Sequence, residues 1–189
     1  MQKLIDKIRE NAAVLSDGII DVDSFISQQV DVALMDEAGK EIAKNFEDQG
    51  ITKQFTIESS GITPAAFAAK HMDLPLVILK KKGSRTQNPN RWQTEVISPA
   101  KETSYELTLA CDFINENDHI LLVDDFLADG EAATGAVRLI RRAHATVAGM
   151  AVLIDKTYCP GEGKLKSQGI PVFALAKIAS ADENGIAFE

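Results

Sequence analysis

Residues 119–145 read HILLVDDFLADGEAATGAVRLIRRAHA, and this stretch decides the fold. It opens with an apolar run at 120–123, long enough for a buried strand, and two acidic residues, Asp124 and Asp125, close the run. A short turn with Gly130 follows. Apolar residues then recur at helical spacing, with arginines on the opposite face. The order of strand, acidic pair, turn and helix predicts one strand–helix unit of a parallel sheet.

The turn between this strand and its helix has the properties of a site for a sugar phosphate. Backbone N–H groups at the start of a helix, together with the helix dipole, favour an anion. The carboxylates of Asp124 and Asp125 can accept hydrogen bonds from adjacent sugar hydroxyls. Phosphate and sugar would therefore bind side by side at this point of the chain.

A second turn of the same kind lies earlier in the chain. Ser59-Ser60-Gly61 follows a brief strand predicted at 55–57 and precedes a helix predicted at 64–70. Such strand-to-helix turns also bind anions, although Ser-Gly turns are common in proteins of every class. Together with the turn near Gly130, this one predicts a substrate that carries phosphates at two ends.

A cluster of basic groups follows the apolar strand predicted at 76–79. The sequence there is Lys80-Lys81-Lys82-Gly83-Ser84-Arg85, and Arg91 comes shortly after it. One interpretation is a mobile loop that closes over bound phosphates and shields the reacting centre from water. The other is a solvated hairpin tip, and the sequence leaves both open. Trp92, the only tryptophan, is predicted to anchor this loop.

Bulk properties exclude several classes of protein. With 189 residues, 45% of them hydrophobic, the chain suits one domain with a real core. A net charge of -8 argues against a nucleic-acid surface, and no apolar run reaches the roughly 18 residues of a membrane span. Cys111 and Cys159 lack metal-site spacing and are expected to pack as small apolar residues in a reducing cytosol. These properties predict a cytoplasmic protein that binds neither nucleic acid nor membrane.

Strands and helices alternate from residue 32 onward. Besides the elements above, helices are predicted at 3–15, 32–49 and 161–168, and strands at 94–98, 106–111, 147–154 and 172–175. This alternation predicts an α/β fold with a doubly wound, mainly parallel sheet in a single domain, 1–189. Both turns, and Lys156 after the strand at 147–154, then follow the carboxyl ends of strands, where such sheets bind ligands.

The layout resembles the phosphoribosyl pyrophosphate motif of the type I phosphoribosyltransferases, which has an apolar strand, two acidic residues and a small-residue loop. Within that family, the likeness to the bacterial purine-salvage enzymes that act on xanthine extends over nearly the whole chain. The matching segments are VLSDGIIDVDSFISQQVD at 14–31, ITKQFTIESSGITPA at 51–65, VDDFLADGEAA at 123–133, and Lys156 after VLID.

The resemblance implies the transfer of a phosphoribosyl group from phosphoribosyl pyrophosphate to a purine base, with Mg²⁺ and release of pyrophosphate. Asp124 and Asp125 would hold the ribose hydroxyls, and a hood formed mainly by 1–31 would cover the base. The residues implied at the 5′-phosphate are Ala128, Asp129, Gly130, Glu131 and Ala132. Those implied at the pyrophosphate are Ser59, Ser60, Gly61 and Lys81. Those implied at the base are Ile20, Ser27 and Lys156. A homodimer is expected from the family alone. Xanthine suits one lysine donor plus backbone groups, and guanine and hypoxanthine stay open.

Two positions in the key loop depart from the family pattern. The broad family usually has threonine and glycine there, and the nearer relatives have amides where this chain has Asp129 and Glu131. Two carboxylates beside a bound phosphate would repel it unless their side chains point away. Each contact between like charges would cost on the order of 1 kcal/mol or more in a partly shielded site.

Other functions for the same pattern remain. A purine-sensing module can reuse this fold, but it needs an attached DNA-binding unit, and no helix-turn-helix precedes the fold here. A phosphoryl-receiver domain carries its acidic pair after the first strand, whereas this pair comes at residue 124. An enzyme of the same class that acts on adenine or orotate is the third alternative. Magnesium-dependent turnover separates an enzyme from a sensor, and base preference separates the enzymes.

Overall fold

The central sheet has six strands in the order β10–β9–β8–β7–β3–β4. A computed structural model describes residues 1–15, 18–81, 89–98 and 103–189 of the chain. The strands of the sheet are β3 (Lys53–Ile57), β4 (Leu76–Leu79), β7 (His119–Leu127), β8 (Thr146–Lys156), β9 (Val172–Asp182) and β10 (Gly185–Phe188). All neighbours pair in parallel except β9 and β10, which form an antiparallel hairpin at one edge.

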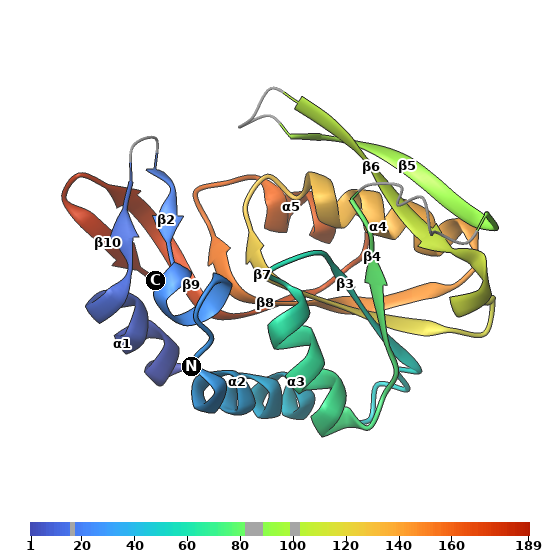
Figure 1. Ribbon diagram of the computed structural model, residues 1–189, viewed down its shortest axis with the longest axis horizontal. Helices are drawn as coiled ribbons and strands as arrows, with labels where there is room; N and C mark the ends of the chain where they lie inside the picture. Colours follow the sequence, from blue (N-terminus) through green and yellow to red (C-terminus); the bar gives the residue numbers. More distant parts are fainter. Residues whose placement is uncertain (16–17, 82–88, 99–102) are drawn as a thin grey trace.

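Helices cover both faces of this sheet (Figure 1). They are α1 (Gln2–Asn11), α2 (Val32–Asn45), α3 (Ile62–Met72), α4 (Glu131–Arg142) and α5 (Gly161–Ser167). Side chains alternate along a strand, so β7 sends Val123 into a cluster with α1–α3 and Leu122 into a cluster with α4 and α5. The predicted doubly wound architecture is confirmed. In the described part of the chain, no helix is long and apolar enough to cross a membrane.

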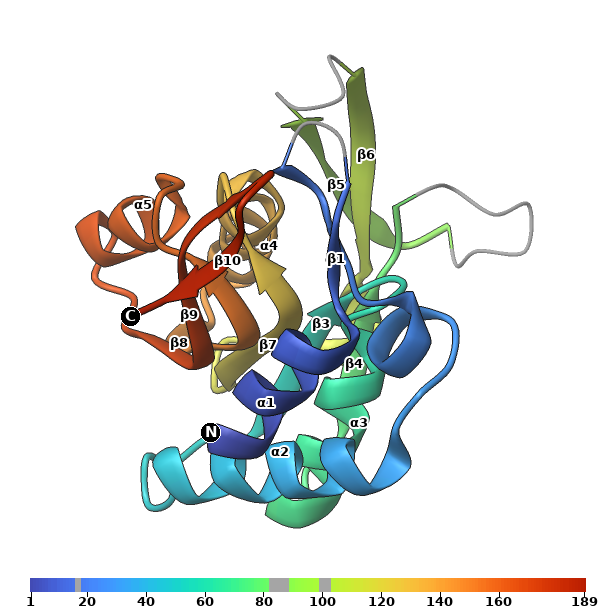
Figure 2. The ribbon, with the colours of Figure 1, turned by 90° about the vertical axis from the view of Figure 1, so that its left-hand side faces the viewer.

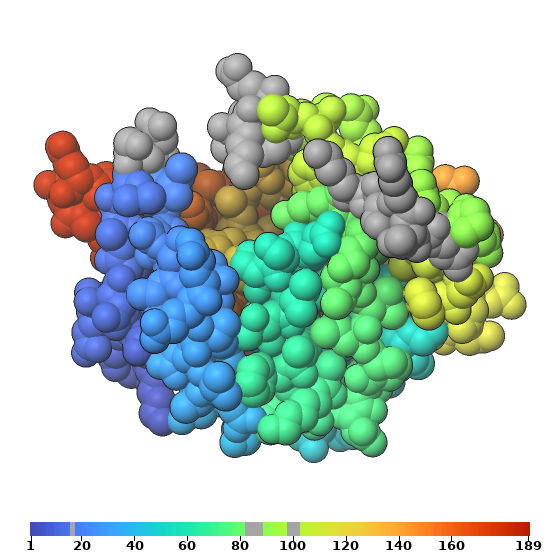
Figure 3. Space-filling view, viewed as in Figure 1, coloured from blue at the N-terminus to red at the C-terminus, as the bar shows by residue number. Residues whose placement is uncertain are grey.

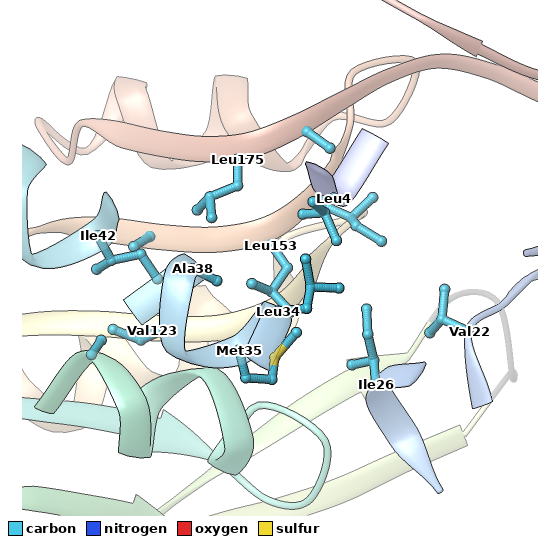
Figure 4. Packing of buried hydrophobic residues seen from close by; sticks show 14 of the residues in the cluster. Leu4, Val22, Ile26, Leu34, Met35, Ala38, Ile42, Val123, Leu153 and Leu175 are labelled. Carbon is cyan, nitrogen blue, oxygen red and sulfur yellow. The ribbon is translucent and has the colours of Figure 1, made fainter. Parts of the chain in front are cut away.

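The core on the α2 side begins with a capped helix. The Asp31 carboxylate accepts a hydrogen bond from the Leu34 N–H at 3.1 Å, which fixes the start of α2. Met35 and Ile42 point from this helix toward Val123 and its neighbours and are fully buried (Figure 4). Burial of each such side chain contributes about 1.5–3 kcal/mol. The helix ends at Asn45, before the predicted residue 49.

The N-terminal segment carries a small sheet outside the central one. After α1 the chain makes β1 (Ala13–Val14), β2 (Ile20–Asp21) and a π-helical turn, η2 (Asp23–Ser27). The predicted helix 3–15 is wrong at its end, because residues 13–14 extend and pair antiparallel with β2. This hood, residues 1–31, and the hairpin described next rise at the same end of the molecule (Figures 1 and 2).

The second unit outside the main sheet is the predicted hairpin. It consists of β5 (Arg91–Ser98) and β6 (Thr103–Ala110), which pair antiparallel along their whole length, followed by a 3-10 turn, η4 (Cys111–Phe113). The Arg138 guanidinium of α4 donates to the Glu95 carbonyl at 2.7 Å, and the Arg142 guanidinium lies 5.8 Å from the centre of the Trp92 ring. Trp92 thus helps to fix the hairpin on α4. The predicted basic loop falls largely on 82–88, outside the described residues.

Candidate functional site

The three segments predicted to bind the substrates follow three neighbouring strands. β3, β7 and β8 lie side by side and run parallel, so their carboxyl ends meet at one edge of the sheet. The turn 58–61 follows β3, the turn 128–130 follows β7, and Lys156 ends β8. In the space-filling view, a hollow opens between the blue N-terminal segment and the cyan-to-green surface around α3, with yellow-to-orange atoms at its floor (Figure 3).

The acidic pair lies inside β7 rather than after it, because the strand continues to Leu127. Asp124 is partly buried as a residue. A Cβ atom added to Gly61 would lie 1.9 Å from the Asp124 Oδ1 atom, so the turn after β3 rests directly on this carboxyl group. Burial, then the charge of Asp125, and then hydrogen bonding with the Asp125 side chain raise the pKa of Asp124 well above 3.8. The contact between Gly61 and the Asp124 carboxyl group therefore brings the end of β3 against β7.

The turn Ser59–Gly61 is closed by its own backbone. The Ile62 N–H donates to the Ser59 carbonyl at 3.1 Å, and the peptide bond between Glu58 and Ser59 is cis. Glu58 also holds the chain after β4, because its carboxylate accepts the Lys81 N–H at 2.5 Å and pairs with the Lys80 ammonium at 3.3 Å. The Lys81 side chain is exposed beside this turn. The basic residues 80 and 81 therefore adjoin the predicted pyrophosphate turn.

In the turn Ala128–Ala132, both unexpected carboxylates have partners within the protein. Gly130 has a φ of 76°, a backbone conformation that glycine adopts without a steric penalty. The Asp129 Oδ1 atom accepts the Glu131 N–H at 2.9 Å at the start of α4. The Glu131 Oε1 atom lies 2.5 Å from the Lys164 ammonium of α5. Lys164 offsets the charge of Glu131, whereas the bond from the Glu131 N–H orients the Asp129 carboxylate without neutralising it.

Lys156, predicted at the base, links β8 to the hood. Its ammonium donates to the Gly18 carbonyl at 3.3 Å and lies 5.7 Å from the centre of the Phe126 ring. Burial lowers the pKa of Lys156. Of the two hood residues predicted beside the base, Ser27 is exposed, whereas Ile20 is only 6% exposed and belongs to the core cluster around α1 and α2.

Tyr105 of β6 was not identified from the sequence, yet it faces the same crevice. The Lys81 ammonium lies 5.7 Å from the centre of its ring. Burial, and then the charges of Asp124 and Asp129, raise the pKa of Tyr105. The alternation of Tyr105, Leu107 and Leu109 shows which residues share a face of the strand. Which face of β6 meets the crevice depends on how the β5–β6 hairpin packs against α4, and this packing cannot be read from the sequence.

A second buried carboxyl group, Asp155, precedes Lys156 in β8. The residue is 1% exposed, and within the described ranges neither of its carboxylate oxygens has a hydrogen-bond partner. Burial, followed by the charge of Glu162, raises the pKa of Asp155 from 3.8 to about 6. Its proton is therefore held more tightly in the folded protein than in the unfolded chain.

Asp155→Asn should stabilise the protein at neutral pH and not at acid pH. Below the unfolded pKa the carboxyl group is protonated in both states. As the pH rises through the folded pKa of about 6, wild type loses on the order of 3 kcal/mol of unfolding free energy that the variant keeps. Thermal unfolding from about pH 4 to about pH 8 tests this, with the exposed Asp73→Asn as control. A variant that gains equally at all pH values would contradict the ionisation of Asp155 as the cause.

Sequence comparisons support an assignment to a family. The family model described as "Phosphoribosyl transferase domain" matches residues 31–178. A xanthine phosphoribosyltransferase from Agathobacter rectalis is 53% identical over 188 residues, with 100% of this chain and 98% of the relative covered. Xanthine phosphoribosyltransferase 1 from Clostridium botulinum is 47% identical over 188 residues, with 100% and 99% covered.

Solved structures share the fold at lower sequence identity. The crystal structure of adenine phosphoribosyltransferase from Rhodothermus marinus has a TM-score of 0.76 and 23% identity, and the match covers 94% of this chain and 99% of that one. Adenine phosphoribosyltransferase from Trypanosoma brucei, in complex with AMP, pyrophosphate and ribose-5-phosphate, has a TM-score of 0.78 and 17% identity over 92% of this chain and 79% of that one. At this identity the likeness concerns the architecture only.

Proposed function

The chain belongs to the phosphoribosyl transferase family, and on that premise we propose that it is a xanthine phosphoribosyltransferase of purine salvage. The reaction transfers the 5-phosphoribosyl group from phosphoribosyl pyrophosphate to xanthine, giving xanthosine 5′-monophosphate and pyrophosphate. The observation that carries the proposal is that β3, β7 and β8 are neighbours. Their carboxyl ends bring two anion turns, an acidic pair and a lysine to one edge of the sheet.

Asp124 and Asp125 act on the ribose in this proposal. Their carboxyl oxygens accept hydrogen bonds from the ribose hydroxyls, which orients the anomeric carbon between base and leaving group. The transition state resembles an oxocarbenium ion, and nearby negative charge stabilises it. No side chain forms a covalent bond with the substrate in this proposal, so catalysis consists of positioning, charge stabilisation and exclusion of water.

In this proposal, each of the two turns binds one phosphate end of the substrate. Backbone N–H groups of 128–132, other than the Glu131 N–H that Asp129 accepts, bind the 5′-phosphate at the start of α4. Ser59, Ser60, Gly61 and Lys81 bind the pyrophosphate. Mg²⁺ bound with the pyrophosphate would offset its negative charge. The described residues contain no cluster of three side chains that would form a metal site on their own. Mg²⁺ commonly takes one or two carboxylates plus substrate oxygens, and the acidic pair fits that requirement.

Lys156, Ile20 and Ser27 bind the base in this proposal. Lys156 already donates to a carbonyl oxygen, that of Gly18, and a carbonyl oxygen of xanthine is the same kind of acceptor. Lys156→Ala should therefore raise KM for xanthine by about tenfold or more, and change KM for phosphoribosyl pyrophosphate much less. Initial rates with each substrate varied in turn measure both constants. Equal rises in both would assign Lys156 to the structure of the hood instead.

We propose a homodimer in the cytoplasm as the working form. An apolar groove of about 340 Å³ runs along β4, the strand at the sheet edge, and is lined by Leu76, Val77, Ile78 and Phe113 among others. Phe113 is 56% exposed there, which supports an interface at this edge. Light scattering on purified protein measures the mass directly.

A turnover assay tests the proposed function. Folded protein is incubated with phosphoribosyl pyrophosphate and magnesium, and with xanthine, guanine, hypoxanthine or adenine in separate reactions. Pyrophosphate release with xanthine as the best base is the expected result. Preference for another base would keep the enzyme class and change the substrate. No turnover with any base would favour a sensing role.

A further inference from the structure

The 5′-phosphate turn, 128–132, contacts the start of α5 as well as leading into α4. The Gly161 N–H donates to the Ala128 carbonyl at 2.8 Å. A Cβ atom added to Gly130 would lie 2.9 Å from the Gly161 Cα atom, so the two backbones are in direct contact. The backbone at the start of α5 thus packs against the backbone of the turn and fixes its position. This support also fixes where the side chains of the first turns of α5 can reach.

Lys164 of α5 reaches back to the phosphate turn. Its ammonium lies 2.5 Å from Glu131 Oε1, and the two side chains are 39% and 28% exposed. The Lys164 carbonyl accepts a hydrogen bond from the Gln168 side-chain amide, and the Gln168 carbonyl in turn accepts one from Arg141 of α4. These bonds link the backbone of α5 at Lys164 to α4, and the Lys164 side chain itself is oriented by Glu131. Its charge offsets that of Glu131, the acidic residue nearest the start of α4.

We propose that Lys164 is a positioning residue for phosphoribosyl pyrophosphate: it neutralises Glu131 and keeps the Glu131 carboxylate away from the 5′-phosphate. This inference rests on the proposed function, which assigns the turn to that phosphate. Without the ammonium, the Glu131 carboxylate would add its uncompensated charge to that of Asp129 at the start of α4, and like charges repel a phosphate at short range. The N–H groups of the turn would then bind the phosphate against that repulsion.

The proposal predicts an effect on one substrate only. Glu131 lies at the phosphate turn after β7, whereas Lys156 lies at the end of β8. Loss of Lys164 should weaken binding of phosphoribosyl pyrophosphate and leave KM for xanthine unchanged. It should also leave kcat nearly unchanged, because the repulsion acts on the bound substrate and on the transition state alike.

Lys164→Met is the test variant, and Glu131→Gln/Lys164→Met is its rescue. We expect Lys164→Met to raise KM for phosphoribosyl pyrophosphate about fivefold to tenfold, with kcat within about twofold of wild type. Removing the Glu131 charge as well should return KM to within about twofold of Glu131→Gln alone. Lys166→Met is the matched control, because Lys166 pairs with Glu162 at 3.0 Å on the same helix. Its KM should not change.

The outcomes separate this inference from the proposed function. Calorimetric titration with phosphoribosyl pyrophosphate alone gives Kd for every variant without any base. If folded wild type does not bind it, the proposed function fails, and this inference fails with it. If wild type binds and Lys164→Met binds equally well, the inference alone fails. A double variant as weak as Lys164→Met would likewise overturn it, since lost packing rather than charge would then explain the defect.

Discussion

Asp125→Asn should lower kcat/KM by about a hundredfold while the protein stays folded. A hydrogen bond to a charged group is worth about 1.5–3 kcal/mol, and each 1.4 kcal/mol is about a factor of ten in rate. The variant keeps the size of the side chain and removes its charge. Because the charge of Asp125 raises the pKa of Asp124, the substitution also makes Asp124 easier to ionise. Asp124 therefore does not lose its own charge in the variant. The fall in kcat/KM would then come from the lost contact of Asp125 alone.

Steady-state kinetics and thermal unfolding on the same preparation check this. Asp73→Asn is the matched control, because Asp73 is exposed at the end of α3 in a left-handed conformation that asparagine tolerates. Turnover like that of wild type in Asp125→Asn would exclude the ribose assignment. A folded, inactive Asp125→Asn beside an active Asp73→Asn would support it.

Gly61→Ala should abolish turnover almost completely. The added methyl group would lie 1.9 Å from Asp124 Oδ1 and 2.7 Å from the hydroxyl oxygen of Thr56. Both neighbours are held by strands of the central sheet, so either the turn or the Asp124 carboxyl group must move. Overpacking of this kind costs about 1–3 kcal/mol of stability. A shift of about 1 Å at a reacting centre can cost a further hundredfold in rate.

Gly163→Ala is the control for Gly61→Ala. Apart from its chain neighbours and the nearby backbone of α5, no heavy atom of the described residues lies within 4 Å of the methyl group that this change would add. Alanine is the better helix former, so the control should gain up to about 1 kcal/mol and keep full activity. If Gly61→Ala is as active as Gly163→Ala, the close contact between the turn and Asp124 has no part in catalysis.

The elements with strong periodicity were predictable from the sequence, and the ends of the chain were less so. The spacing of Met35, Ala38 and Ile42 identified α2, and the apolar run before Asp124 identified β7. The edge hairpin of β9 and β10 was missed, because the stretch at 176–188 mixes polar and apolar residues. Asn184-Gly185 at its turn is a known hairpin signal that could have found it.

The candidate site was predictable where one turn follows one strand, and not where elements from distant parts of the chain meet. The turns at Gly61 and Gly130 were identified because each is continuous in sequence. The pairing of Glu131 with Lys164 and the place of Tyr105 above Lys81 depend on how α5 and the β5–β6 hairpin pack. That packing also decides whether Asp129 and Glu131 oppose a phosphate, which the sequence left as a conflict between like charges.

The hood carries a two-stranded sheet that is separate from the central sheet, and it lies almost entirely outside the residues 31–178 that the family model matches. Under the proposed roles, Ile20 and Ser27 belong to this unit, whereas both phosphate turns belong to the shared part. For protein engineering, exchanging this one contiguous segment would replace two of the three proposed base contacts, while Lys156 in β8 and both phosphate turns stay unchanged. A transplanted segment must reproduce the carbonyl group that Gly18 offers to Lys156, and also the buried side chains, such as Leu4, Ile8 and Phe25, that the hood packs against α2 and the sheet.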